Sequence, residues 1–271
     1  MEWKNIYRGV LMGASDVIPG VSGGTIAVLL GIYDRLIAAI NGVLSKNWKK
    51  QLGFLVPLGT GIVIAIFSLS HLIKWLLKYY PQPLQFFFLG LILGIIPYLF
   101  RQADANNTFR IRHVLILLVG AAVVGSLALI GENEGSAVQD RTLMTYAWLL
   151  MAGFLASSAM ILPGISGSLI FLMIGAFQTV ITGISDMQLD VIAAVGIGIV
   201  LGISVMSKII HFFLVHYRIA TFALVTGLVI GSLVVVFPGW PATVPLVLAS
   251  IATFALGLSA AYILGKVEHA D

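Results

Sequence analysis

Pro19-Gly20-Val21-Ser22-Gly23-Gly24-Thr25 interrupts an apolar run near the amino terminus, and a second copy follows 144 positions later as Pro163-Gly164-Ile165-Ser166-Gly167-Ser168. Proline cannot continue a helix and glycine frees the backbone, so each copy predicts a helix, a break and a second helix. A broken helix inside a bilayer is tolerated where its loose backbone is buried in protein or lines a cavity. Two such breaks in matching halves of a chain indicate the binding site of a transporter.

The similarity between the two halves continues along the chain. Residues 26 and 170 are both isoleucine, and residues 31 and 175 are both glycine, at the same spacing of 144 positions. Later in the chain the spacing is 137 positions, and the identical residues include Gly59 and Gly196, Gly61 and Gly198, Gly90 and Gly227, and Gly94 and Gly231. We therefore expect two repeats, residues 1–130 and 143–271, joined by a linker at 131–142.

The composition is that of an integral membrane protein. Of the 271 residues, 59% are hydrophobic and only 10% are charged, and mean hydropathy is +1.06, whereas soluble domains carry about 25% charged residues. The apolar runs leave no room for a soluble nucleic-acid-binding domain, and the net charge of +4 is modest. The chain has no cysteine, and its five histidines lack metal-ligand spacing, so we expect no disulfide, metal or cofactor.

Apolar runs follow each broken segment, and most approach or exceed the roughly 20 residues that cross a bilayer. In the first repeat we expect a broken-helix hairpin at 6–40 and spans at 52–77, 86–100 and 114–130. In the second repeat we expect a hairpin at 143–184 and spans at 190–214, 219–237 and 244–264.

Lysine and arginine are enriched in cytoplasmic loops, so their distribution indicates the topology. If each broken segment enters and leaves on one side and the amino terminus is cytoplasmic, 11 of these residues are cytoplasmic and 3 are external, with Arg35 uncounted. If each broken segment crosses fully, the split falls to 8 and 6. The sequence therefore predicts an all-α integral membrane protein with two inverted-topology repeats, each a re-entrant broken-helix hairpin plus three transmembrane helices. The linker at 131–142 is then external.

The hairpin tips carry residues suited to binding an anion. The helix after each turn begins near the membrane midplane, where its unpaired N–H groups act as about half a positive charge and suit phosphate or carboxylate. Glycines permit close approach and hydroxyls add donors. The expected substrate-binding residues at the tips are Ser22, Gly23, Gly24, Thr25, Ser166, Gly167 and Ser168. The alternative is that each turn only allows helices to pack closely.

Two charged residues flank the first turn. Asp16 precedes Pro19 by three residues among apolar neighbours, where an ionisable group is costly and usually functional. It is a candidate proton-coupling residue or the counter-ion of Arg35, and the alternative is that it caps the hairpin tip. Arg35 either clamps a phosphate or extends to the membrane surface. Its equivalent in the second repeat is Thr179.

Two further pairs of basic residues occupy equivalent places in the repeats. His71 with Lys74, and Lys208 with His211, lie three residues apart and therefore on one helical face. Inversion places one pair toward each side of the membrane. Each pair could receive an anionic head group in its own leaflet, and the alternative is that the lysines only reach toward the membrane surface.

The run from Gly13 to Ile26, continuing through Gly31-Ile32-Tyr33-Asp34-Arg35, resembles the signature of the bacterial polyprenyl-phosphate transporter family. The resemblance covers essentially the whole chain, including the second Pro-Gly-Ile-Ser-Gly. It implies a multi-pass protein of the bacterial plasma membrane that returns undecaprenyl phosphate from the outer to the inner leaflet, so that the lipid carrier of cell-wall synthesis is recycled. Its expected partners are polyprenyl phosphate, membrane lipids and, as one option, further copies of the chain.

Two rival functions are compared with this interpretation. Membrane undecaprenyl-pyrophosphate phosphatases also have inverted repeats, but their Pro-Gly-x-Ser motif is followed by arginine and is accompanied by paired helical glutamates. Here Gly23 follows Ser22, and the glutamates, all outside the apolar spans, are Glu2, Glu132, Glu134 and Glu268. No general base for hydrolysis is evident. A carrier of small inorganic anions stays open, because the anion site alone would equally permit it.

Overall fold

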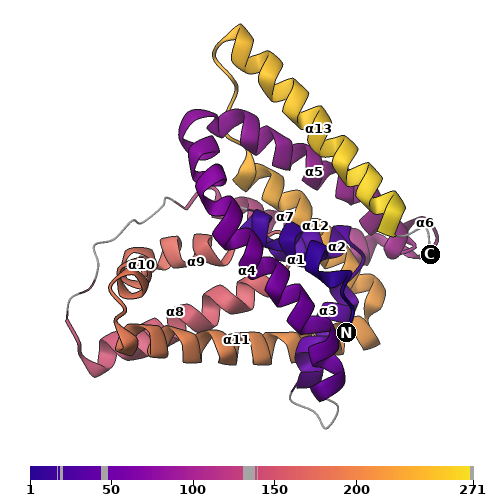
Figure 1. Ribbon diagram of the computed structural model, residues 1–271. Coiled ribbons are helices and arrows are strands. Elements are labelled where there is room, and N and C mark those ends of the chain that lie inside the picture. The colour runs from indigo at the N-terminus through magenta and orange to yellow at the C-terminus, as the bar shows by residue number, and fades with distance from the viewer. Residues whose placement is uncertain (17, 19–20, 44–47, 131–137, 139, 269–271) are drawn as a thin grey trace.

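The computed structural model describes residues 1–16, 18, 21–43, 48–130, 138 and 140–268, apart from the side chains of residues 70, 71, 74 and 106 (Figure 1). Every regular element in these residues is a helix. The helices are α1 Asn5–Asp16, α2 Gly23–Leu29, α3 Tyr33–Val43, α4 Trp48–Tyr79, α5 Pro81–Gln102, α6 Ala105–Thr108, α7 Ile111–Leu127, α8 Leu143–Ile161, α9 Gly167–Ile174, α10 Phe177–Ser185, α11 Leu189–His216, α12 Arg218–Val236 and α13 Val244–Glu268.

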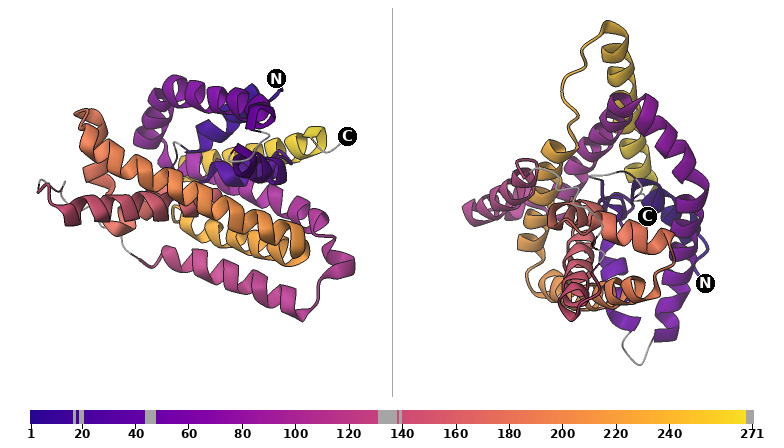
Figure 2. Two further views of the ribbon diagram at one scale, coloured as in Figure 1. Left: turned by 90° about the horizontal axis from the view of Figure 1, so that it is seen from below. Right: turned by 90° about the vertical axis from the view of Figure 1, so that its left-hand side faces the viewer.

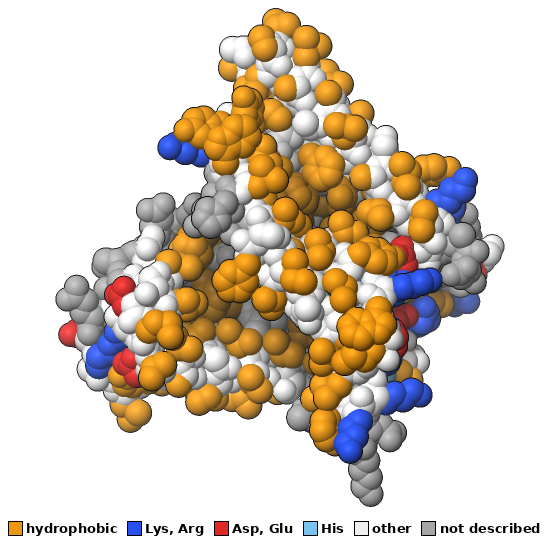
Figure 3. Space-filling view, in the orientation of Figure 1, with side chains coloured by type: hydrophobic (Ala, Val, Ile, Leu, Met, Phe, Trp, Pro, Cys, Tyr) orange, Lys and Arg blue, Asp and Glu red, His pale blue; other side chains and the backbone are white. Residues whose placement is uncertain are grey.

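Six of the described helices are long and apolar enough to cross a membrane: α4, α5, α8, α11, α12 and α13. α7 is shorter, at 17 residues. The surface in Figure 3 is largely hydrophobic, with most charged side chains at its left and right margins. These features confirm an all-helical, multi-pass membrane protein. α8 is long enough to cross a membrane by itself. From the sequence we expected this segment to be one arm of the second re-entrant hairpin.

Four helix pairs pack closely: α1 with α4, α8 with α11, α5 with α13, and α7 with α12. Glycines bring the backbones together. A Cβ added at Gly61 would lie 2.0 Å from the carbonyl oxygen of Ile6, and one at Gly198 would lie 2.1 Å from that of Leu150. Ile6 and Leu150 are 144 positions apart and the two glycines are 137 positions apart, which are the spacings found between the halves of the sequence. Gly61 and Gly198 therefore lie at equivalent helix contacts in the two halves.

The first broken segment starts and ends at the same end of α4. α1 and α4 run parallel, because Gly9 lies against Leu58 and Gly13 against Ile62. α2 and α3 therefore bring the chain back toward its starting point before α4 begins. Arg35, in α3, donates from Nη1 to Oε1 of Gln51 at 2.7 Å, next to the beginning of α4.

The second broken segment has the same arrangement. α8 and α11 are parallel, because Gly198 lies against Leu150 and Gly202 against Phe154. Tyr146, near the start of α8, donates a hydrogen bond of 2.7 Å to Asp190 in the first turn of α11. Between these helices, α9 and α10 meet at a bend of 111°.

The two hairpins lie at opposite ends of α11. This helix has 28 residues and a length of about 42 Å. Asp190 at its first turn joins the second hairpin, whereas Arg218, just beyond its last residue, forms an ion pair of 3.0 Å with Asp34 of the first hairpin. Figure 1 shows the same placement, with α10 at the left end of α11 and α3 at the right end.

Two helix pairs each combine one helix from the first half of the chain with one from the second half. α5, from the first half, packs against α13 from the second, and α7 packs against α12. Both pairs are parallel and use glycines against backbone, with Gly90 facing Phe254 and Gly227 facing Leu117. α13 is the least buried of the six long helices and projects past the others in Figures 1 and 2.

Candidate functional site

The turn that precedes α2 and the turn that follows α8 are in direct contact. The Gly164 amide donates to Oγ1 of Thr25 at 2.8 Å, and the Ser22 hydroxyl donates to the Met160 carbonyl oxygen at 3.4 Å. Thr25, Ser22 and Ser166 are all buried. Pro19 and Gly20 lie outside the described residues. The structure therefore brings together the described residues of the two turns, which are 144 positions apart in the sequence.

A carboxylate occupies the start of α2. The Gly23 amide donates to Oδ1 of Asp16 at 2.7 Å, and the Gly24 amide donates to Oγ of Ser22 at 3.1 Å. A Cβ added at Gly23 would lie 2.7 Å from Oδ2 of Asp16, so glycine is needed for this close approach. The Asp16 carboxylate thus occupies the position at this helix start where an external anion would bind. This is the capping role that the sequence analysis gave as the alternative for Asp16.

Within the described ranges, no such carboxylate lies at the start of α9. Gly164 has a φ of +90°, which glycine adopts readily, and its backbone lies against the carbonyl of Leu228. Ser166 is the N-cap residue, but its side chain makes no capping hydrogen bond. Instead, the Ser166 and Ser168 hydroxyls lie 2.8 Å apart and bond to each other. Gly167 packs against the Ala156 carbonyl oxygen. The two turns therefore differ in what satisfies their helix starts.

A cavity of about 240 Å³ adjoins the first turn. Asp16, Gly23 and Gly24 line it on one side, and Ser157 and Met160 of α8 line it on another. Its remaining walls are apolar side chains of α1, α3, α4, α8 and α11, together with Gly59. The Asp16 carboxylate is thus the ionisable group of this cavity among the described residues.

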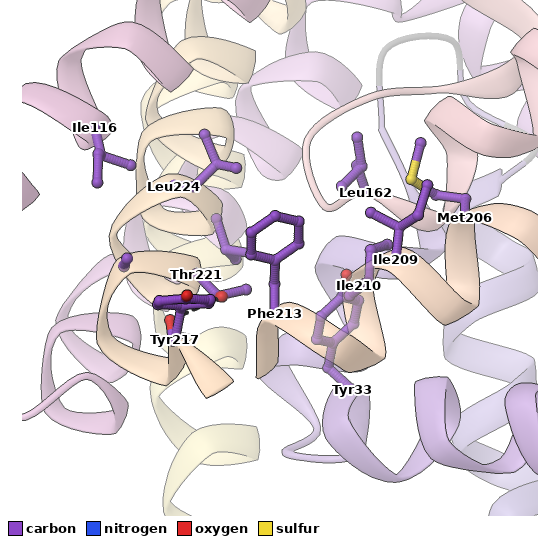
Figure 4. Close-up of a pocket in the computed structure, with 12 residues that line it drawn as sticks. Tyr33, Ile116, Leu162, Met206, Ile209, Ile210, Phe213, Tyr217, Thr221 and Leu224 are labelled. Atoms are coloured by element: carbon purple, nitrogen blue, oxygen red, sulfur yellow. Dashed lines mark hydrogen bonds between the residues drawn. The ribbon is translucent and has the colours of Figure 1, made fainter. Parts of the chain in front are cut away.

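A second cavity, of about 440 Å³, lies between α11 and α12 (Figure 4). Its walls are almost wholly apolar, and Figure 4 shows the ring of Phe213 pointing into it, with Leu162 and Leu224 on either side. Tyr33, from α3, also lines it, and its hydroxyl donates to the Ile161 carbonyl oxygen at 3.3 Å. The end of α8 thus contributes to both cavities, with Ile161 lining the first and Leu162 the second.

The structure does not place Arg35 with the turns. Its guanidinium bonds to Gln51, lies 3.8 Å from the Glu2 carboxylate and stacks 5.0 Å above the ring of Phe54. Arg35 therefore joins the open end of the first hairpin to the beginning of α4. Its equivalent, Thr179 of α10, accepts a hydrogen bond of 3.0 Å from the Val138 amide, which precedes α8.

Lys208 and His211 lie on α11, the former exposed and the latter half-buried. In the described part of the chain, neither side chain makes a hydrogen bond or ion pair, and neither contacts the turns. His71 and Lys74 belong to α4, and their side chains lie outside the described set.

Tyr33 is a site residue that the sequence reasoning missed. It is buried, its hydroxyl bonds to the end of α8, and its ring lines the apolar cavity. The signal was present, because Tyr33 is part of the quoted signature, but an aromatic residue in an apolar run has no chemical pattern of its own. No group of three histidine, aspartate or glutamate side chains that could hold a metal occurs among the described residues.

Comparisons of the sequence with known proteins find a family and two relatives that are named for transport. The family model described as undecaprenyl phosphate translocase-like matches residues 12–255. A protein of Staphylococcus aureus named polyprenyl-phosphate transporter is 40% identical, over 98% of this chain and 97% of its own. A protein of the same name from Vibrio cholerae is 38% identical, over 90% of this chain and 80% of its own. No solved structure matches the chain. The family and both relatives are named for transport rather than for an enzymatic reaction, and the chain belongs to the undecaprenyl phosphate translocase-like family.

Proposed function

We propose that this protein carries a polyprenyl phosphate, undecaprenyl phosphate in particular, across the bacterial plasma membrane from the outer to the inner leaflet. One observation carries the proposal: the two broken-helix turns contact each other next to two cavities. One cavity contains the Asp16 carboxylate, and the other is almost wholly apolar. Such a site at the junction of two repeats is typical of transporters. The names of the two relatives supply the substrate class.

The proposed architecture is a pair of inverted repeats with re-entrant hairpins. Parallel packing of α1 on α4, and of α8 on α11, supports hairpins that return to the side from which they start. Asp190 and Arg218 mark opposite ends of α11, which supports entry of the hairpins from opposite faces. The distribution of lysine and arginine supports a cytoplasmic position for the amino terminus and for the open end of the first hairpin.

The proposed phosphate position is the second turn. The helix start at Gly167 lacks a carboxylate, and the Ser166 and Ser168 hydroxyls can turn from each other toward an incoming phosphate oxygen. At the first turn, Gly23 and Gly24 would be available only after Asp16 leaves the start of α2. An ionised Asp16 therefore competes with a phosphate for the same amides and also repels it.

This competition suggests how protons enter the cycle. When Asp16 takes up a proton, it loses its charge and its hold on the Gly23 amide weakens, because hydrogen bonds to a charged acceptor are stronger. The phosphate can then use both turns. When Asp16 releases its proton, the carboxylate returns to the helix start and favours release of the phosphate. Transport is then coupled to protons.

The apolar cavity beside Phe213 is suited to the first part of the polyprenyl chain, since it offers a hydrocarbon no polar group to desolvate. Lys208 with His211, and His71 in the other repeat, are proposed to attract the head group in their own leaflets before it reaches the turns. Arg35 is proposed to act on the substrate only through the hairpin that it holds in place.

A leaflet-accessibility assay tests the function. Purified protein is reconstituted in vesicles with undecaprenyl phosphate, and an impermeant phosphatase is added outside. We expect the whole lipid pool to lose phosphate when the protein is present, whereas protein-free vesicles keep their inner pool protected. An inner pool that stays protected with the protein present would contradict the proposal. So would equal uptake of inorganic phosphate, which has no chain, because that result would identify a small-anion carrier.

A further inference from the structure

α5 and α13 form a groove on the outside of the molecule, distant in the chain from both turns. The two helices run parallel, with Gly94 against Ala261. Arg101 lies in the last turn of α5 and Lys266 in the last turn of α13, so both cations stand at the same end of the groove. Basic residues at the end of a membrane helix lie at the level of lipid head groups.

The groove has a polar part and an apolar part that adjoin. A cavity of about 680 Å³ contains Arg101, Lys266 and the ring of Tyr98. A second cavity, of about 560 Å³, shares Gly94, Pro97 and Tyr262 with the first and continues along apolar side chains of both helices, Leu93, Leu258 and Ile263. A charged end and a hydrocarbon-lined end match the two parts of a lipid.

We propose that this groove binds an anionic glycerophospholipid of the surrounding membrane. The phosphate lies between Arg101 and Lys266, and an acyl chain lies along Leu258 and Ile263. Lysine and arginine near a membrane surface attract anionic lipids. The bound lipid fills the space between two helices that come from different repeats and so holds them together.

The acidic residues close in sequence to the two cations contact other groups, and Asp104, three residues beyond Arg101, accepts a hydrogen bond of 2.8 Å from the Asn107 side chain. Glu268, two residues beyond Lys266, is bonded to Arg8 of α1. Among the described residues, the side chains of Arg101 and Lys266 form no ion pair with an acid. Two cations are thus left for a ligand.

The cations are not a consequence of helix packing, since the matching groove lacks them. α12 and α7 form the same parallel glycine contact as α5 and α13. At the spacing of 137 positions, Arg101 corresponds to Pro238 and Lys266 to Leu129. The surface between α7 and α12, called the uncharged groove, therefore has no cation at the positions equivalent to Arg101 and Lys266, and only the groove between α5 and α13 suits an anionic lipid.

The position favours a bulk phospholipid over the transported substrate. None of the residues that line the groove belongs to the two turns or their hairpins. Tyr262 and Ile263 are exposed on α13, which lies at the top edge of the molecule in Figure 1 and in the right view of Figure 2. An open groove of this kind fills by mass action with the most abundant matching lipid.

Quenching of a fluorescent label tests the proposal in nanodiscs. The chain has no cysteine, so a single cysteine in Ile263→Cys carries the label and one in Ser126→Cys, the equivalent position in the uncharged groove, carries the control. Phosphatidylglycerol or phosphatidylcholine with a quencher on one acyl chain is then added to each. We expect roughly tenfold stronger quenching by phosphatidylglycerol at residue 263 and no preference at residue 126.

Two further variants separate binding from folding. Arg101→Gln with Lys266→Gln should abolish the preference at residue 263, whereas Arg101→Lys with Lys266→Arg should keep it. An equal preference at residues 263 and 126 would overturn the proposal, as would a preference that survives the glutamine changes. Loss of the preference on addition of a few mole per cent of undecaprenyl phosphate would also overturn it, because the groove would then belong to the substrate.

Discussion

Asp16 and Thr25 give the first turn hydrogen bonds that the second turn cannot make. Their equivalents, 144 positions later, are Met160 and Leu169, which have neither a carboxylate nor a hydroxyl. Asp16 accepts from Gly23 within the first turn, and Thr25 accepts from Gly164 of the second. The two turns thus share a backbone pattern but differ in their caps, since Asp16 bonds to the start of α2 whereas the Ser166 side chain does not cap α9.

Neutralising Asp16 should separate its charge from its shape. Asparagine caps a helix about as well as aspartate, so Asp16→Asn should fold normally and bind a short-chain polyprenyl phosphate more tightly, since no internal anion competes. The response of transport to a proton gradient should disappear. Binding and transport in vesicles, with and without a gradient, measure both effects. If the variant still responds to the gradient as the natural chain does, Asp16 is only a cap and coupling lies elsewhere, with His71 and His211 the next candidates.

Thr25→Val should weaken the contact between the two turns. The valine has nearly the same shape but leaves the buried Gly164 amide without its acceptor, which costs about 1–3 kcal/mol. Thr25→Ser retains the hydroxyl and is the matched control. Denaturant unfolding in detergent measures the difference. Equal stability of the valine and serine variants would show that the hydrogen bond does not join the turns.

Single residues also show where sequence reasoning reached its limit. The grouping of Ser22 and Thr25 with Ser166 followed from the repeat. The position of Arg35 could not be predicted from the repeat, because it depends on Gln51 and Glu2. The positions of these two residues are set by the return of the first hairpin and the start of α4. Ion-pair partners far apart in a chain leave no local pattern.

At the scale of elements, parallel helix pairs held by glycine are the recurring unit. Most of the expected apolar runs overlap long helices, because length and apolar composition mark such segments. The ends of α4 were underestimated, since the helix reaches from Trp48 to Tyr79 whereas the apolar run is 52–77. Helices continue through polar residues at membrane surfaces, where composition no longer marks them. Which helices pair was not predictable from composition either.

Neighbouring glycines in α4 and α11 offer a test of this pairing. Gly61→Ala and Gly198→Ala place a methyl group about 2 Å from a carbonyl oxygen of the partner helix, so the pair must separate, at a cost of about 1–3 kcal/mol. Gly59→Ala and Gly196→Ala, two residues earlier on the same helices, meet nothing within 4 Å and should be neutral. Detergent unfolding of the four variants measures both pairs. The same loss at all four positions would argue against specific glycine contacts.

At the scale of the whole molecule, the two halves are joined at many places, including ion pairs between α3 and the start of α12 and between α1 and the end of α13. The turns meet at the centre, and α5 with α13 and α7 with α12 pair helices of different halves. Separate movement of one half would therefore break the packing of both helix pairs. We infer that motion during transport is concentrated in the hairpins, which have their own contacts with α4 and α11.

The central claim is that the hairpins enter the membrane from opposite faces, and impermeant thiol labelling tests it most directly. Lys49→Cys reports the open end of the first hairpin and Asp186→Cys that of the second, each in a chain with no other cysteine. Lys266→Cys is the control, since the Arg8–Glu268 ion pair places the end of α13 beside the first hairpin. We predict labelling of residue 186 in intact cells, and of residues 49 and 266 only after the membrane is opened. Labelling of residues 49 and 186 from the same side would contradict the account.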